Sequence, residues 1–149
     1  MKTTLFFFIT LVTINLTMAQ TSDHIKKTKS NYSVEETAKK ILEIVKSKGL
    51  NVFTEISHSE GATKAGLELE NTHLIIFGNP KVGTKLMQCD RNMGLMLPLK
   101  VLIWSEGDQT YLGHIDPSFF GENFDLDGCT EILEKIRGAL NGIVGAATK

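Results

Sequence analysis

The sequence predicts an α+β fold, a single antiparallel sheet with helices packed on one face. The predicted order is β-α-β(4)-α, that is strand, helix, four strands and helix, with one further helix inserted among the strands. Two observations predict it. Segments of strand and helix periodicity follow one another in that order, and no repeat, long linker or low-complexity segment interrupts them. The chain has 149 residues, near the usual size of one domain, so a single core suffices.

The first strand and the first long helix have clear boundary signals. Weak alternation predicts a strand over 24–30, and Ser33 with Glu36 then forms a capping box that opens a helix. Gly49 is the expected C-terminal cap of that helix. Between the caps, apolar side chains recur at the spacing of one helix face: Val34, Ala38, Ile41, Leu42 and Val45.

Two strands follow, separated by a short polar helical turn. Alternation predicts a strand over 50–57, and the apolar run of "THLIIF" predicts another over 72–77. The helical turn between them is expected from Ser59 to Ala65. The apolar centre of the 72–77 strand is continuous, so we expect this strand to be buried on both sides.

The second half of the chain begins with a hairpin. Pro98 marks a boundary, and the strands 99–104 and 110–115 flank "SEGDQ", which contains the Gly-Asp pair of a hairpin turn. Asp116 and Pro117 then predict the start of a short helix.

The last helix is predicted from about Thr130, where apolar residues again recur at helical spacing. It contains three glycines, which weaken a helix, so we expect them to mark close packing against another backbone. These are Gly138, Gly142 and Gly145.

The first nineteen residues have the pattern of a signal peptide. Lys2 precedes an apolar run over 5–16, and small residues lead to Ala19. The run is shorter than the roughly twenty residues that span a bilayer. We therefore expect cleavage after Ala19, a single α+β domain over 20–149, and a periplasmic or secreted protein without an integral membrane segment after processing. Gln20 follows the cut in place of a cysteine, so a lipid anchor is not expected.

The charge balance excludes one class of partner. The chain has 16 Lys and Arg against 17 Asp and Glu, so it has no bulk positive field. Proteins that bind the phosphate backbone of nucleic acids carry such a field. Nucleic acid is therefore not an expected partner.

The two cysteines allow two interpretations. An exported protein meets oxidising conditions, so Cys89 and Cys129 could form a bridge, but such a pairing needs a geometry that the sequence does not show. In a helix that begins at Lys85, Leu86, Cys89 and Met93 would share one buried face. We favour this second interpretation, in which Cys89 is a small core residue rather than a free reactive thiol.

The stretch "FGNPKVGTKLMQCD" at 77–90 resembles a phosphate-binding loop only superficially. From Gly78 to Lys85 it has two glycines at the Walker A spacing, but Thr84 and Lys85 stand in the reverse order. Pro80 also removes one backbone donor from the loop. We therefore do not expect nucleotide hydrolysis.

Two interpretations of this stretch remain. In the first, Asn79 and Pro80 form a turn and Thr84 caps a helix. In the second, free amides at the helix start attract an anion or a carbonyl, aided by nearby lysines. The candidate ligand-binding residues are His58, Asn79, Lys81, Thr84, Lys85 and Gln88.

The histidines and methionines predict no metal site and no cofactor. The four histidines lack a paired ligand spacing, and Met87, Met93 and Met96 recur as core residues do. His58 would lie beside the Asn79 turn if the two neighbouring strands pair, as a general base or a ligand contact. A structural hydrogen bond is the simpler role for it.

The chain resembles the family called domain of unknown function 302. The resemblance rests on "FGNPKVGTKLMQ", "HSEGATKAGLELE", "LPLKVLIW" and the Asp116-Pro117 pair, and it extends over nearly all of the chain after the leader. It implies a TATA-binding-protein-like α+β fold, generally as a dimer, and no established activity. Family members commonly have a small residue where Cys89 stands, and the segment "FFGENFDLDGC" lacks the basic or histidine-bearing form often found there.

Three function classes follow from these features. The favoured one is an exported, dimeric module that binds a small molecule or an anion near the 78–88 turn. The alternatives are an enzyme of unknown reaction that uses His58 in a pocket beside this turn, or a purely structural, partner-binding protein.

Overall fold

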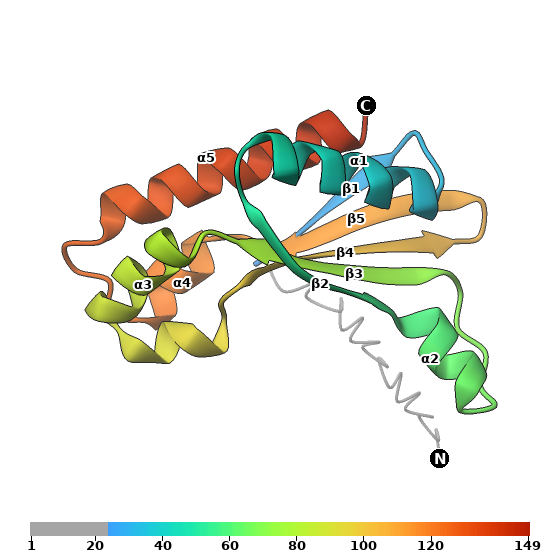
Figure 1. Ribbon diagram of the computed structural model, residues 1–149, viewed down its shortest axis with the longest axis horizontal. Coiled ribbons are helices and arrows are strands. Elements are labelled where there is room, and N and C mark those ends of the chain that lie inside the picture. Colours follow the sequence, from blue (N-terminus) through green and yellow to red (C-terminus); the bar gives the residue numbers. More distant parts are fainter. Residues whose placement is uncertain (1–23) are drawn as a thin grey trace, which may run out of the picture.

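Five antiparallel strands form one sheet, in the order β1-β5-β4-β3-β2. The computed structural model describes residues 24–149, so the predicted signal peptide lies outside the described residues. The predicted fold class and element order are confirmed (Figure 1). The strands are β1 (Ile25–Ser30), β2 (Asn51–Ser57), β3 (Thr72–Gly78), β4 (Leu99–Glu106) and β5 (Gln109–Ile115).

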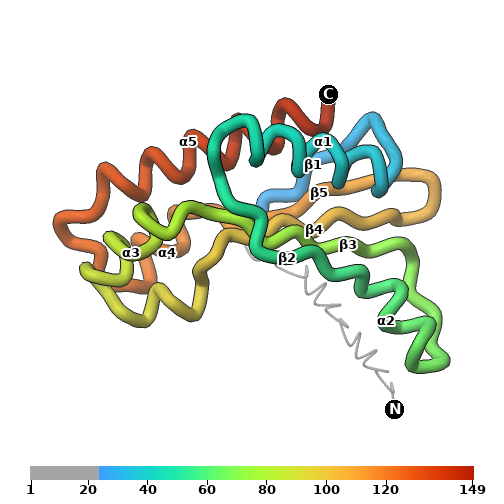
Figure 2. Tube along the Cα trace, in the orientation of Figure 1, coloured from blue at the N-terminus to red at the C-terminus, as the bar shows by residue number. Residues whose placement is uncertain are grey.

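The two long helices cover one face of this sheet, and the short helices lie at its ends (Figure 1). The chain passes through α1 from one edge strand, β1, to the other, β2 (Figure 2). One end of the sheet carries α3, η1 and α4, and the other carries α2. The helices are α1 (Val34–Ser47), α2 (His58–Lys64), α3 (Pro80–Cys89), the 3-10 helix η1 (Arg91–Leu95), α4 (Ser118–Asn123) and α5 (Thr130–Ala147).

Local signals set the ends of α1 as expected. The Glu36 amide donates to the Ser33 hydroxyl at 3.2 Å, and Gly49 follows the helix with a φ of +67°, which favours glycine. The side chains of Ile41 and Val45 are fully buried against the sheet. The Ser33 cap and the helical periodicity were therefore sufficient to place this element.

The apolar core has two parts. The first lies between the sheet and the helices α1 and α5, and includes Ile75, Phe77 and Val101. The second lies under α3, η1 and α4, and includes Leu86 and Met93. The two parts meet where α3 and the first turns of α5 approach the ends of β3 and β4.

A disulfide joins Cys89 to Cys129, across a sequence separation of 40 residues. The interpretation of Cys89 as a core thiol is therefore wrong. Cys89 ends α3 and Cys129 directly precedes α5, so the bridge ties these two helices together. Periodicity alone could not reveal this, because α4 and a loop bring Cys129 back to α3.

Two further expectations are corrected. The glycines of α5 face open space, with no atom within 4 Å of a Cβ added to Gly138, Gly142 or Gly145, so they do not mark a close helix contact.

The strand β3 is fully buried on one side only. Ile75 and Phe77 point into the core, while Leu74 and Ile76 are half-buried on the side away from α1 and α5.

Candidate functional site

The turn between β3 and α3 is closed by Asn79. Its side-chain oxygen accepts from the Lys81 amide at 2.9 Å, and Pro80 occupies the first helical position. The prediction that Thr84 caps the helix is therefore wrong, since Thr84 lies within α3. An asparagine followed by proline already satisfies the first turn, so the helix begins five residues before Lys85.

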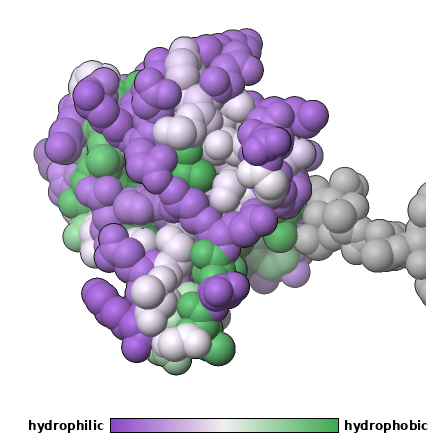
Figure 3. Space-filling model, turned by 90° about the vertical axis from the view of Figure 1, so that its right-hand side faces the viewer, coloured by the Kyte–Doolittle hydropathy of each residue, from purple (hydrophilic) through white to green (hydrophobic). Residues whose placement is uncertain are grey.

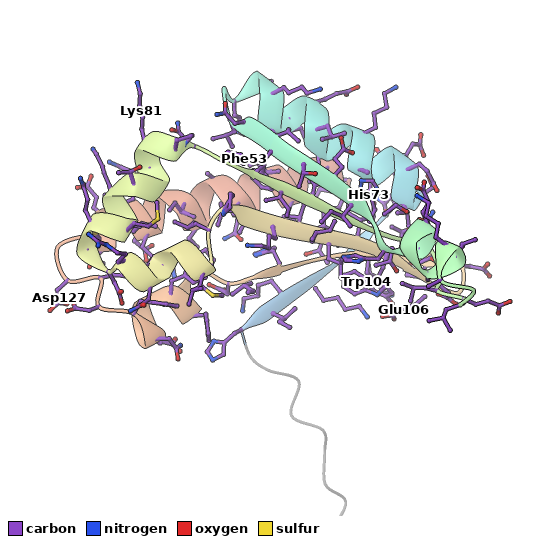
Figure 4. The ribbon with its side chains drawn as sticks, turned by 60° about the horizontal axis from the view of Figure 1, so that its bottom comes forward. Phe53, His73, Lys81, Trp104, Glu106 and Asp127 are labelled. Atoms are coloured by element: carbon purple, nitrogen blue, oxygen red, sulfur yellow. A yellow bond between two sulfur atoms is a disulfide. The ribbon has the colours of Figure 1, made fainter. Side chains whose placement is uncertain are left out.

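The amides at the start of α3 are occupied. The Lys81 amide donates to the Asn79 side chain, as described above. The amides of Val82 and Gly83 donate to the backbone carbonyl of Asn79 at 3.0 and 2.9 Å. The Lys81 side chain points away from the protein body (Figure 4), and Lys85 is also exposed. The free amides on which an anion site would depend are thus already paired within the turn.

An apolar cavity of about 450 Å³ lies beside this turn. It occupies the junction between the two parts of the core, with α3 on one side and α5 on the other. The floor comes from the ends of β3 and β4. The apolar side chains that line it are Leu50, Phe53, Phe77, Pro80, Val82, Met87, Leu97, Pro98, Leu99, Ile136, Ala139, Leu140 and Ile143.

Small residues and a bulge leave this space open. Gly78, Gly83 and Gly94 line the cavity without side chains. The pairing of β2 with β3 shifts its register between Val52 and Thr54, so Phe53 is 49% exposed at the cavity (Figure 4). The Cys89–Cys129 bridge joins the two helices that form the walls.

The segment before β4 is held in place by Lys100. Its ammonium group donates to the carbonyls of Met96 and Pro98 at 3.1 and 2.9 Å. Burial lowers the pKa of Lys100 below the ordinary lysine value. The peptide bond between Leu97 and Pro98 is cis, and both residues line the cavity.

Polar groups are few in this cavity. They are Asn79, Thr84 and Lys135, and the ammonium group of Lys135 lies 2.7 Å from the Glu131 carboxylate on the same helix. Among the described lining residues, Lys135 is the only titratable side chain. The site therefore offers a large apolar surface, a few polar groups, and no acid-base pair.

The structure brings together only part of the predicted site. Asn79 and Thr84 line the cavity, whereas Lys81, Lys85 and Gln88 are exposed and not among its lining residues. The α5 wall was missed, because its periodic apolar residues indicate a core helix equally well. Only the fold shows that part of this face borders an empty space.

His58 lies at the opposite end of the sheet. The strands β2 and β3 do pair, but Asn51 faces Gly78 while Ser57 faces His73. His58 is therefore more than six strand residues, about 20 Å, from the Asn79 turn. The expectation that it lies beside this turn is wrong, because antiparallel pairing places the end of β2 next to the start of β3.

No cluster of three or more His, Cys, Asp or Glu side chains suited to a metal occurs within residues 24–149. Within the same residues, every helix is too short or too polar to cross a bilayer.

Comparison with known proteins identifies a family and a fold. The family model described as Domain of unknown function DUF302 matches residues 26–144. A crystal structure of an uncharacterized conserved protein DUF302 from Bacillus stearothermophilus superposes with a TM-score of 0.76. It covers 86% of this chain and 100% of that chain at 19% identity, so the likeness is one of fold.

Sequence relatives with a curated name are found in Brucella. A protein named fluoride-specific ion channel FluC 1, from Brucella suis biovar 1 (strain 1330), is 40% identical over 121 residues, which are 80% of this chain and 46% of the relative. Its namesake from Brucella abortus biovar 1 (strain 9-941) matches at the same identity over 44% of its length. This chain thus spans less than half of the curated relatives it matches.

Proposed function

Because this chain belongs to the DUF302 family, whose name specifies no activity, we propose a function from its cavity: an exported module that binds an apolar small molecule without converting it. The observation that carries the proposal is the space beside the Asn79 turn. Its volume of about 450 Å³ lies within the range of ligand sites in proteins, roughly 300–1,000 Å³.

The chemistry of the lining selects the class of ligand. Apolar side chains surround most of the space, so each buried CH₂ of a ligand would contribute about 0.8 kcal/mol. Asn79 and Thr84 offer hydrogen bonds, and Lys135 offers a positive charge that is already shared with Glu131. A ligand with an apolar body and one polar end fits this distribution, whereas a small inorganic anion does not.

Binding is favoured over catalysis by the same residues. An enzyme of the kind considered from the sequence needs a titratable group poised in the pocket, and His58 lies about 20 Å away along the sheet. Lys135, the titratable lining residue, is paired with Glu131. The geometry thus supports holding a molecule rather than transferring its protons.

Export and dimerisation are parts of this proposal. The leader pattern over 1–19 supports export, and the Cys89–Cys129 bridge is consistent with it, since disulfides persist in oxidising compartments. The family resemblance and the two edge strands, β1 and β2, support a homodimer. The fluoride conduction in the name of the Brucella relatives belongs to those whole proteins, of which this chain matches less than half.

An uncharged apolar dye tests the cavity directly. N-phenyl-1-naphthylamine gains fluorescence when it leaves water, so titration of the protein should give a saturable signal. The variant Ala139→Phe places a large side chain on the exposed wall of the cavity and should weaken dye binding at least about tenfold. The matched control is Ala146→Phe, an exposed alanine of the same helix that does not line the cavity.

Equal dye binding by wild type and Ala139→Phe would remove the cavity as the site. Thermal stability of both variants should stay near that of wild type, because both positions are exposed. An unfolded Ala139→Phe would be recognised by its circular dichroism, and Ala139→Met then serves as the milder variant.

A further inference from the structure

A second cavity lies at the end of the sheet opposite the Asn79 turn. It is an open cleft of about 630 Å³ between the end of β1, the first turn of α1 and the hairpin that joins β4 to β5. Val34 is the only aliphatic residue among the described residues that line it. Figure 3 views the molecule from this end and shows mostly hydrophilic residues on its upper part. This cleft, called the polar cleft, thus differs in chemistry from the apolar cavity.

The register of the strands places a row of hydroxyl groups in the polar cleft. Thr110 of β5 lies directly opposite Ser30 of β1 and Ser105 of β4, and all three line the cleft. Residues directly opposite each other lie on the same side of a sheet. Leu112 and Ile103, two residues further along β5 and β4, belong to the core beneath α1 and α5. The row therefore faces the helices, one step beyond the apolar core.

Thr110 has a buried hydroxyl group that faces this cleft. The residue is only 8% exposed, and the surface that it retains lies in the cleft. The hydroxyl of its neighbour Ser30 pairs with that of Thr37 at 2.7 Å, whereas the Thr110 hydroxyl makes no hydrogen bond to another group within residues 24–149. Buried polar groups normally have a partner, so an occupant of the cleft is the group that can provide one.

Internal hydrogen bonds use the amide donors of the cleft and leave its acceptors free. The side-chain NH₂ group of Asn71 donates to Glu35. That of Gln109 donates to the carbonyls of Ser30 and Thr110 at 3.1 and 2.9 Å. The side-chain oxygens of Asn71 and Gln109 can only accept. A molecule that fits the cleft must therefore bring hydrogen-bond donors.

The charge of the cleft is negative. Glu35 and Asp108 contribute two carboxylates, one from α1 and one from the hairpin, and the described lining contains no Lys, Arg or His. Hydrogen bonds from its own backbone amide and from Asn71 hold the pKa of Glu35 below its ordinary value, so this carboxylate is ionised at neutral pH. The Lys40 ammonium lies over the Tyr32 ring and is not part of the lining. The cleft therefore favours a cation over an anion.

We propose that the polar cleft binds a small organic amine, whose ammonium group lies between the carboxylates of Glu35 and Asp108 and donates to the free oxygens around Thr110. An ammonium group has three donors and a positive charge, which matches both properties of the lining. A single water-sized group needs roughly 30 Å³, so a cleft of about 630 Å³ suits an organic molecule better than a bare metal ion. This site is separate from the apolar cavity and does not depend on the function proposed for it.

Titration of the isotope-labelled whole chain with the diamine putrescine tests the proposal. Butane-1,4-diol is the matched ligand, because it has the same carbon chain with hydroxyls in place of the ammonium groups. At constant ionic strength, putrescine should shift the amide resonances of Ser105, Asp108 and Thr110 with a Kd near or below about 1 mM. The diol should bind at least about tenfold more weakly, because it brings no charge.

Two variants assign the site. Asp108→Asn removes one carboxylate and keeps a residue that suits a hairpin turn, and Thr110→Val removes the hydroxyl without a partner. Each should weaken putrescine binding at least about fivefold. The matched control, Asp127→Asn, removes the same charge from an exposed position at the other end of the molecule and should bind like wild type (Figure 4).

Several outcomes would overturn the amine site. These are the absence of a saturable shift up to about 10 mM putrescine, equal binding of the diol, and full binding by Asp108→Asn or by Thr110→Val. A loss in Asp127→Asn as large as in Asp108→Asn would mean attraction by the overall charge in place of a site. Melting curves exclude misfolding, and Thr110→Val should not lower the melting temperature, since its hydroxyl has no protein partner to lose. Dye binding by Asp108→Asn should equal that of wild type, so the two cavities are tested separately.

Discussion

Removing the Cys89–Cys129 bridge should destabilise the protein more than any single exposed substitution. A bridge limits the freedom of the unfolded chain, and the sequence separation here is 40 residues. For a loop of this length the chain-entropy relation gives an entropy change of about 13 cal/mol/K, or about 4 kcal/mol at 25 °C. The double variant Cys89→Ala with Cys129→Ala should lose a free energy of unfolding of this size.

Urea unfolding followed by circular dichroism measures this loss. With about 2.1 cal/mol/K of unfolding entropy per residue, a domain of this size should melt roughly 15 °C lower. Dithiothreitol should lower the melting temperature of wild type by a similar amount and leave the double variant unchanged, which is the control for general effects of the reductant. The bridge also joins the two helices that line the cavity, so dye binding should weaken on reduction.

A loss below about 1 kcal/mol, or an equal response of both proteins to the reductant, would refute this reasoning. The first result would mean that the unfolded chain is already restricted where the bridge closes it. The second would mean that the bridge does not form in the purified protein.

Further predictions address the helix ends, one exposed glycine, acid stability and export. Because Asn79 caps α3, Asn79→Ala should lower the free energy of unfolding in urea by about 1 kcal/mol, whereas Thr84→Ala should change it by less than about 0.5 kcal/mol. A larger loss for Thr84→Ala than for Asn79→Ala would contradict the role of Asn79 as the cap. Gly142→Ala should raise stability by up to about 1 kcal/mol, since the position is helical and its Cβ would meet no atom; a lower melting temperature would count against that geometry. The Ser118 amide and, less strongly, Lys26 hold the pKa of Asp116 below its ordinary value. The ionised carboxylate therefore contributes stability above its ordinary pKa, about 3.9, and this is lost as the pH falls through the lower folded value. Asp116→Asn should flatten the loss of stability measured below about pH 4, and an unchanged acid profile would exclude this role. Mass spectrometry of the exported fraction should find an N-terminus at Gln20, and an intact Met1 on the exported protein would contradict cleavage.

The sequence by itself determined the elements and their order. The Ser33 cap of α1, the glycine after α1 and the Gly-Asp turn of the hairpin act within a few residues, so the sequence alone was able to indicate them. Periodicity likewise identified α1 and α5. Asn79 and Thr84, two of the candidate residues of the 78–88 turn, line the cavity.

Only the tertiary structure decided which segments each element packs against. The pairing of Cys89 with Cys129, the α5 wall of the cavity and the distance of His58 from Asn79 depend on contacts between segments far apart in the chain. Periodicity shows that a side chain faces inward, but it does not show whether packed atoms, an empty space or solvent lies opposite. The cavity is such a case, because its apolar residues follow the same pattern as the filled core.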